Sequence, residues 1–486
     1  MKDFAKTLAL VACVALGVAG CRTTKEVLDD YEANLVAGNY AALPGEAAEL
    51  AAEGDDSSLL WNLLAGGGFY LTDDKAQART HFDAAEDAMQ RNDATSVFAR
   101  GAEGGLAMMT NDRAFAYDGG GQDRVFTCLY KAIDFMCAGQ VGPARTELNR
   151  ALQHQENWIW ERRKDVEAAG KKMAADADAY MAQKRDAQVS GDRAQQTANV
   201  LADASFAAQV RAQCGFDPAR SGNLETLAAS DYLNAYAQHV CGVFRWLDGD
   251  GGLGALKTAA ACAPGSPAAR DAAEAAQGAK PTNQVWIWVE DGLCPVREEW
   301  RVDLPLALLP YAGRYVLYAG MALPYLRPRA AAAASWRVEA GGAVTPLAPL
   351  ADVDHLVKTE YDVYMRGALT REITRTVVKT GVQIALGVAA DNTKDDNHRL
   401  ALRLSQLGVA TWAMSTTAAD LRSWTTLPKS VRCVRIDRPA DGRIDVLADN
   451  QRIQLTVPPG NSMVFLRKPG AAALPVAKQV TFGVKN

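Results

Sequence analysis

Long hydrophobic runs are lacking beyond the first twenty residues. After residue 20, no stretch of eighteen or more uncharged apolar residues occurs in the 486-residue chain. A helix that crosses a bilayer needs about 20 predominantly apolar residues. The body of the protein is therefore predicted to lie outside the hydrocarbon core of a membrane.

Motifs for metal binding and covalent catalysis are lacking as well. The chain has five histidines, and none forms His-x-x-x-His or His-Glu-x-x-His. His239 and Cys241 are two residues apart, a spacing that places them on different sides of a helix. Neither Gly-x-Ser-x-Gly nor Ser-x-x-Lys occurs. We therefore expect no metal, no cofactor and no enzymatic activity.

Cysteine pairs with redox spacing are absent too, because no Cys-x-x-Cys occurs among the nine cysteines. Setting aside Cys13 and Cys21 near the N-terminus leaves seven cysteines, an odd number. At least one thiol must then be unpaired within the chain. Most of the seven lie in apolar helical runs, so we predict that they are buried as small hydrophobic residues.

The first twenty residues have the pattern of a bacterial lipoprotein signal peptide. Lys2 and Lys6 precede a thirteen-residue run of apolar and small residues, Leu8–Gly20. Small residues directly before Cys21 are typical of a lipobox, in which that cysteine is acylated. The alternative is an ordinary secretory signal with an incidental cysteine. Arg22, rather than aspartate, follows Cys21 and favours sorting to the outer membrane.

Charge argues against nucleic acid or anionic lipid as a partner. The chain has a formal net charge of −5, and residues 1–20 contain two lysines and one aspartate, so the remainder is at −6. The membrane contact that we expect is the lipid on Cys21.

Two segments offset by 66 residues share a helical pattern. In a tetratricopeptide unit, a small residue lies where two helices cross and a large apolar side chain fills the gap. The matching pairs are Gly66 and Ala132, Phe69 and Phe135, Ala78 and Ala144, Phe82 and Leu148, and Ala85 and Ala151. A weaker third unit contains Trp246, Ala255, Ala259 and Pro267. The alternative is a generic helical bundle.

Composition divides the chain into three parts of a multidomain α+β protein. Residues 1–20 form the signal peptide, and residues 21–280 form a helical, tetratricopeptide-like repeat domain. Within that domain we expect a long helix over about 145–212. Residues 281–486 are rich in short strands with Asp-Gly and Pro-Gly turns, which predicts an antiparallel β-sandwich-like region. A helical insertion is expected over about 352–390.

Several blocks of the chain resemble a poorly characterised family of bacterial lipoproteins with tetratricopeptide repeats. The central block includes Arg124, Tyr130-Lys131-Ala132 and a closing Ala-Arg-x-Glu-x-x-Arg at residues 144–150. The later blocks are VEDGLCPVREEWRVDLP, MALPYL and DLRSWTTLP. The resemblance implies a cell-envelope lipoprotein with repeats followed by a β-rich region. It implies no established activity and suggests a cell-wall role by association only.

Five basic residues are the candidates for binding a partner. Arg371, Arg375 and Lys379 follow one another at intervals of four residues, which forms a basic stripe on a helix. The stripe is either the solvated edge of an amphipathic helix or a contact for an acidic partner. Arg145 and Arg150 either form helix-packing ion pairs or line a groove between repeats.

These features together predict a non-enzymatic lipoprotein of the outer membrane that faces the periplasm and recruits a protein partner. The rival hypothesis is a protein that binds or cleaves peptidoglycan or another glycan. Trp286 and Trp288 could stack on sugar rings from one face of a strand. Other candidates for such stacking are Trp158, Trp160 and Trp300. The glycan hypothesis requires Trp286 and Trp288 to be exposed side by side.

Overall fold

A computed structural model describes residues 23–94 except 56, and residues 117–158, 193–218, 221, 226–303 and 312–483. The predicted signal peptide, Cys21 and Trp160 lie outside these ranges. None of the helices within them is both long and apolar enough to cross a membrane.

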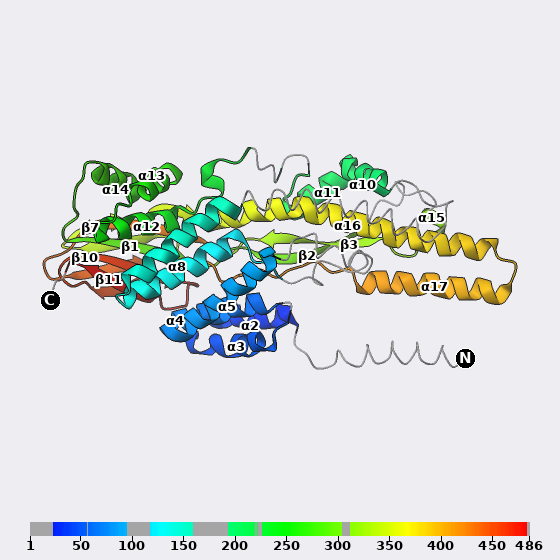
Figure 1. The fold of residues 1–486 in the computed structure, drawn as a ribbon, viewed down its shortest axis with the longest axis horizontal. Helices are drawn as coiled ribbons and strands as arrows, with labels where there is room; N and C mark the ends of the chain where they lie inside the picture. The colour runs from blue at the N-terminus through cyan, green and yellow to red at the C-terminus, as the bar shows by residue number, and fades with distance from the viewer. Residues whose placement is uncertain are drawn as a thin grey trace.

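Helices dominate the first half of the described chain (Figure 1). They begin at residues that cap a free helix end: Thr23 and Glu26 form a capping box, and Asn234 caps through its side chain. The labelled helices are α2 (Thr24–Ala37), α3 (Pro44–Glu53), α4 (Ser58–Leu71), α5 (Lys75–Ala94), α8 (Gly121–Cys137), α10 (Arg193–Ala202), α11 (Ala204–Cys214), α12 (Ala235–Asp248), α13 (Leu253–Cys262) and α14 (Pro267–Ala276). Residues 141–158 are also helical.

The long helix expected over 145–212 is interrupted within the described residues. Asp203 has an extended backbone, with φ −68° and ψ 119°, and its carboxylate accepts a hydrogen bond from the Phe206 amide. An aspartate that caps the next helix ends the preceding one. The prediction of one nearly continuous helix is therefore wrong at Asp203, and residues 159–192 lie outside the described ranges.

The two segments offset by 66 residues each form part of a helix pair, α4 with α5 and α8 with residues 141–158. A Cβ atom added at Gly66 would lie 2.6 Å from the Phe82 ring, so the helices cross closely there. Both helix pairs bury the aligned residues of their second helices completely. These residues are Ala78, Phe82, Ala85, Ala144, Leu148 and Ala151.

Strands form three sheets in the second half of the chain. The five-stranded sheet has the order β11-β10-β1-β7-β6, the four-stranded sheet has the order β5-β4-β8-β9, and β2 pairs with β3. The strands are β1 (Gln284–Asp291), β2 (Val296–Asp303), β3 (Gly320–Arg327), β4 (Trp336–Ala340), β5 (Ala343–Pro346), β6 (Ala348–Asp352), β7 (Ser430–Asp437), β8 (Arg443–Ala448), β9 (Gln451–Thr456), β10 (Asn461–Lys468) and β11 (Val476–Phe482).

Each of the two larger sheets contains strands that precede the helical insertion and strands that follow it. In the central sheet β1 pairs with β10 in parallel and with β7 in antiparallel orientation. The expectation of a purely antiparallel sandwich is therefore wrong at β1–β10. More than 150 residues separate these two strands, so the connection is long enough to make the parallel crossover.

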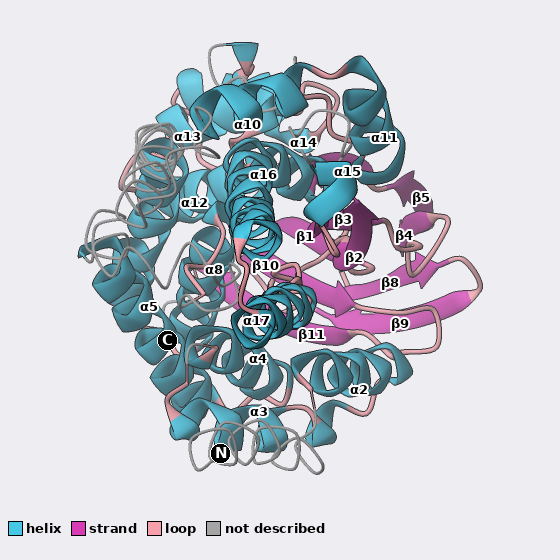
Figure 2. Ribbon diagram, turned by 90° about the vertical axis from the view of Figure 1, so that its right-hand side faces the viewer, coloured by secondary structure: helices cyan, strands magenta, loops and turns pink. Residues whose placement is uncertain are grey.

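Both faces of β1 are buried. Val285, Ile287 and Val289 share a hydrophobic cluster with residues of the four-stranded sheet. Trp286 and Trp288 point the other way, into a core shared with the helices. Figure 2 shows the helices gathered on that side of the strands. The helical and β-rich parts therefore share one hydrophobic core.

A helical hairpin extends from this shared core. Helix α16 (Val353–Asn392) has 40 residues, about 60 Å at the usual rise, and α17 (Asp396–Ser415) returns along it (Figure 1). The β2–β3 ribbon, α10 and α11 pack against α16. The insertion predicted over 352–390 is confirmed as a helix by α16, whereas α17 was not predicted.

A buried polar network joins the helices to the central sheet. Asp271 of α14 accepts hydrogen bonds from Trp286 (2.9 Å) and from His239 Nε2 (2.7 Å). His239 Nδ1 in turn accepts from Trp288 (3.1 Å), and Arg435 of β7 pairs with the other Asp271 oxygen (2.7 Å). Burial raises the pKa of the Asp271 carboxyl, but the His239 hydrogen bond and the Arg435 charge outweigh it, so the pKa is lowered.

Asp271→Asn should lower the free energy of unfolding at pH 7 by about 3 kcal/mol, because Arg435 loses the buried one of its two carboxylate partners. A lowered carboxyl pKa stabilises the fold above the unfolded-state pKa, and this is lost as pH falls through the folded-state pKa. The difference between variant and parent should therefore shrink below about pH 4. Urea unfolding followed by tryptophan fluorescence measures both effects.

Asp29→Asn is the matched control. Asp29 is exposed and pairs only with Lys25 on its own helix, so its substitution should change the free energy of unfolding by less than about 0.5 kcal/mol. An equal effect of the two substitutions would contradict the role of Asp271.

Candidate functional site

Helix α8 is buried along nearly its whole length, including its polar residues. Many of these buried polar side chains find partners on neighbouring elements. The pairs are Gln122 with Asn234 (2.9 Å), Asp123 with Tyr117 (2.5 Å), Arg124 with Asp93 (2.7 Å), Tyr130 with Glu290 (2.9 Å), Lys131 with Glu86 (2.7 Å) and Asp134 with Lys478 (2.9 Å). This helix, which contains the first part of the central block of the family resemblance, is therefore the junction of the fold.

The N-terminal end of α8 receives a carboxylate from α16. Glu360 Oε1 accepts a hydrogen bond from the Gln122 amide (2.7 Å). A negative charge is favourable there because the first amides of a helix have no partner within it. Cβ atoms added at Gly120 and Gly121 would lie 2.6 and 2.7 Å from the Glu360 oxygens. The two glycines therefore make this approach possible.

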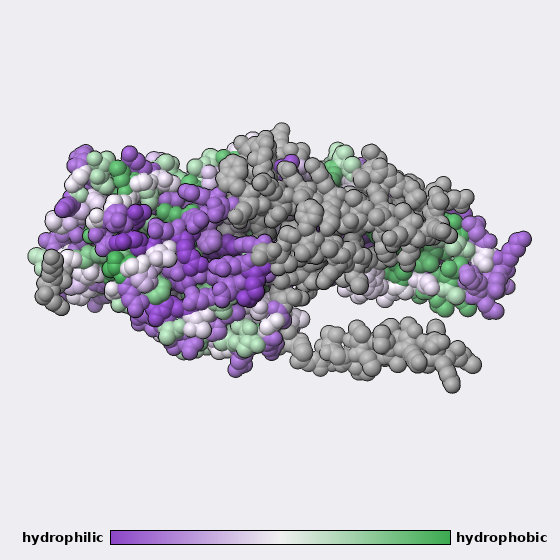
Figure 3. All heavy atoms as spheres, viewed as in Figure 1, coloured by the Kyte–Doolittle hydropathy of each residue, from purple (hydrophilic) through white to green (hydrophobic). Residues whose placement is uncertain are grey.

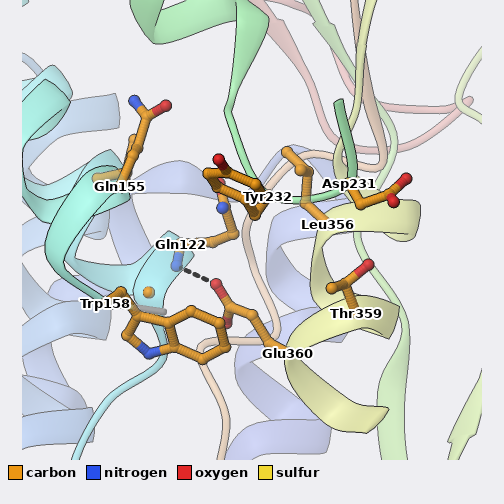
Figure 4. Close-up of a pocket in the computed structure, with 10 residues that line it drawn as sticks. Gln122, Gln155, Trp158, Asp231, Tyr232, Leu356, Thr359 and Glu360 are labelled. Carbon is orange, nitrogen blue, oxygen red and sulfur yellow. Dashed lines mark hydrogen bonds between the residues drawn. The ribbon is translucent and has the colours of Figure 1, made fainter. Parts of the chain in front are cut away.

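A small pocket, partly open to solvent, lies beside this contact. Figure 4 shows the Trp158 indole next to Glu360, with Tyr232 on another side. Asp231 also lines the pocket, and its Oδ1 is 2.9 Å from His355 Nε2. The hydrogen bond from His355 lowers the pKa of the Asp231 carboxyl.

The chemistry of this pocket suits binding better than catalysis. Its described lining contains no serine, cysteine, lysine or histidine, and the Thr359 hydroxyl donates to the backbone oxygen of His355. No nucleophile with an adjacent base is therefore present among these residues. Two carboxylates beside aromatic rings favour a small cationic group such as an amine.

The predicted candidates Arg145 and Arg150 lie at different contacts. Arg145 pairs with Asp248 and Asp250 at the end of α12. Arg150 pairs with Glu147 (3.1 Å) and with Glu86 of α5 (3.0 Å). Both arginines thus link neighbouring helices, as the packing interpretation expects.

The expected solvated basic edge of α16 is wrong for two of its three residues. Arg375 is buried and pairs with Glu372, and Lys379 is buried against α17. Lys379 donates to the Thr416 hydroxyl (2.9 Å) and lies over the Trp412 ring. Burial lowers the pKa of Lys379 to about 8.

Arg371 is only partly buried and lies 5.8 Å from the centre of the Tyr364 ring. The stripe is therefore not one surface, since its second and third residues point into packed regions. Helical spacing could place the three residues on one face, but it could not show that α17 covers part of that face.

All seven remaining cysteines are free thiols, and five of them are buried. This confirms the prediction that they mostly serve as small core residues. Trp286 and Trp288 are both 0 % exposed, so they offer no surface for stacking on a sugar. The glycan hypothesis therefore lacks the pair of exposed tryptophans that it requires.

Helix α17 exposes a row of large apolar side chains that the sequence analysis missed. Leu400, Leu404, Leu407 and Met414 are 50–59 % exposed, and Thr411 is exposed between them. Hydrophobic surface is visible at this end of the molecule in Figure 3. The spacing of four and three residues was the signal available in the sequence, because it is the heptad pattern of a coiled coil.

Comparisons with known protein families, curated proteins and solved structures found no match to this chain. The resemblance to a lipoprotein family therefore stays a prediction.

Gly121→Ala should lower the free energy of unfolding by about 1–3 kcal/mol, because the new methyl group displaces Glu360 and Trp158. The control is Gly254→Ala in α13, where an added Cβ meets nothing within 4 Å. That control should be neutral or stabilising by up to about 1 kcal/mol. Thermal and urea unfolding of both variants would make the comparison. Equal stability of the two variants would argue against the Glu360 contact.

Proposed function

We propose that this protein is a lipid-anchored, non-enzymatic component of the bacterial cell envelope that binds a protein partner through the α17 stripe, defined as Leu400, Leu404, Leu407, Thr411 and Met414. The acyl group on Cys21 would attach the chain to the outer membrane, facing the periplasm. The helix pairs α4–α5 and α8 with residues 141–158 would be tetratricopeptide-like units. Their equivalent buried small and apolar residues support this assignment.

The observation that carries the proposal is the exposed row of apolar residues on α17. An adjacent side of the helix, with Gln406, Ala410 and Ala413, is buried. Apolar side chains aligned on an otherwise solvated helix are typical of an interaction surface. Helix α17 packs against α16, and α16 in turn packs against the β2–β3 ribbon and α10. The stripe therefore lies on a helix that is supported by the rest of the protein.

We propose an amphipathic helix of another protein as the occupant. The stripe has alternating spacings of four and three residues over about 20 Å, which fits the seam of a two-helix coiled coil. Beside it lie the small exposed residues Ala401, Gly408 and Ser415, which let a second helix approach closely. A second copy of the chain is the alternative occupant, and sedimentation of the purified protein distinguishes the two.

The double substitution Leu404→Glu and Leu407→Glu should abolish partner binding without unfolding the protein, because both side chains are exposed. A photo-crosslinking residue at Ala401 would identify the helix that lies along the stripe. The binding affinity of the purified pair, measured by calorimetry, should fall at least tenfold in the double variant.

Leu474→Glu is the control, because Leu474 is exposed and lies outside α17. It should bind the partner as the parent does. Sedimentation of the purified parent should show a monomer at micromolar concentration. A dimer that the double substitution dissociates would contradict the proposal of a heterologous partner.

Cys21→Ser should move the protein from the membrane fraction to the soluble periplasmic fraction, because a single thiol carries the predicted lipid. Cys13→Ser, within the same signal segment, should leave it in the membrane fraction. Immunoblots of fractionated cells, with metabolic labelling by a fatty acid, measure both. Equal fractionation of the two variants would contradict lipid anchoring.

A further inference from the structure

Three potential metal ligands, each from a different helix, lie close together around Cys128 of α8. They are Glu86 of α5, Cys128 of α8 and His154 of the helical residues 141–158. One ligand atom of each lies within 4.8 Å of the others. Glu86 and Cys128 are buried, whereas His154 is only partly buried and gives the cluster a side toward solvent.

The two carboxylate oxygens of Glu86 contact different groups. Oε2 accepts from Lys131 (2.7 Å) and pairs with Arg150 (3.0 Å). Oε1 faces the thiol of Cys128, whose sulfur lies 3.1 Å away. The two cations therefore fix the carboxylate so that its other oxygen points to the sulfur, as residues behind a metal ligand commonly do.

His154 adds a third ligand from the facing helix. Within the described part of the chain its imidazole has no hydrogen-bond partner, although one of its nitrogens is close to both the Glu86 oxygen and the Cys128 sulfur. A polar ring aimed at a thiol and a carboxylate, with no partner of its own, is available as a donor to an ion.

The surrounding charges allow a divalent cation despite the two basic residues. Lys131 also pairs with Glu147 (3.1 Å) and Asp83 (2.6 Å). The carboxylates of Asp83, Glu86 and Glu147 together exceed the charges of Lys131 and Arg150 by one. A divalent ion that displaces the thiol proton would bring the whole cluster to neutrality.

We propose that Glu86, Cys128 and His154 form a binding site for Zn²⁺. The sulfur and nitrogen ligands favour zinc over the calcium and magnesium that all-oxygen sites select. On binding, the Cys128 thiol gives up its proton to water and the thiolate, imidazole and carboxylate occupy three positions of a tetrahedron. The fourth position is left to a water molecule on the side of His154. Such an ion would link three helices and stabilise this region.

Co²⁺ is the spectroscopic probe for this site, because a thiolate bound to Co²⁺ gives an intense near-ultraviolet absorption. Metal-free, full-length protein in detergent should develop this band with one equivalent of Co²⁺, and Zn²⁺ should remove it by displacement. Cys128→Ser should abolish the band. Cys137→Ser, on the same helix but with its sulfur directed toward Gln479, should retain it.

His154→Ala provides a second variant in case Cys128→Ser does not fold. Saturating Zn²⁺ should raise the Tm of the parent and of Cys137→Ser, because a ligand that binds only the folded state stabilises it. The same addition should leave the Tm of His154→Ala unchanged. Absence of the band in the parent, its persistence in Cys128→Ser, or an equal Zn²⁺-dependent shift in His154→Ala would each overturn the proposal. This inference does not depend on the function proposed for the α17 stripe.

Discussion

The burial of α8 is the constraint on which the rest of the structure depends. A helix surrounded by protein must satisfy every polar side chain that it carries, because an unpaired buried group costs about 1–3 kcal/mol. The partners of α8 come from α5, α12, α16 and two strands of the central sheet. Each pair fixes one element relative to this helix. The helical and the β-rich parts therefore cannot pack independently of one another.

Glu290 shows how closely the helical and β-rich parts are coupled. It lies on β1, in the central sheet, and accepts hydrogen bonds from Tyr130 of α8 and Tyr236 of α12. Burial raises the pKa of this carboxyl, although Arg467 and the two tyrosines lower it. Together with the Asp271 network, this contact puts hydrogen-bonded polar side chains inside a core that is otherwise apolar. Such contacts define one relative position of helices and sheet.

The hairpin of α16 and α17 is less enclosed than α8. Helix α16 starts near α8, where Glu360 caps that helix, and continues to the hairpin with α17. Helix α16 thus connects the buried surroundings of α8 with the exposed apolar residues of α17. Between these ends, Arg375 and Lys379 are covered by packing that their spacing alone did not reveal.

Several features were predictable from sequence because they depend on local periodicity. The composition located α16 to within a few residues. Capping by Asp203 was overlooked because the helical pattern continues on both sides of it. The alignment of the α17 stripe residues on one face was also predictable from their spacing. Their exposure was not predictable, because spacing shows which residues share a face and not whether another element covers that face.

Sequence patterns were enough to place a helical part before a strand-rich part with a helical insertion, to bury most cysteines and to locate the two similar helix pairs. The parallel pairing of β1 with β10, and the meeting of Glu86, Cys128 and His154, became apparent only in the folded protein. These contacts join residues that are far apart in the chain. Local patterns record how residues a few positions apart face one another, whereas contacts between distant residues depend on how whole elements pack.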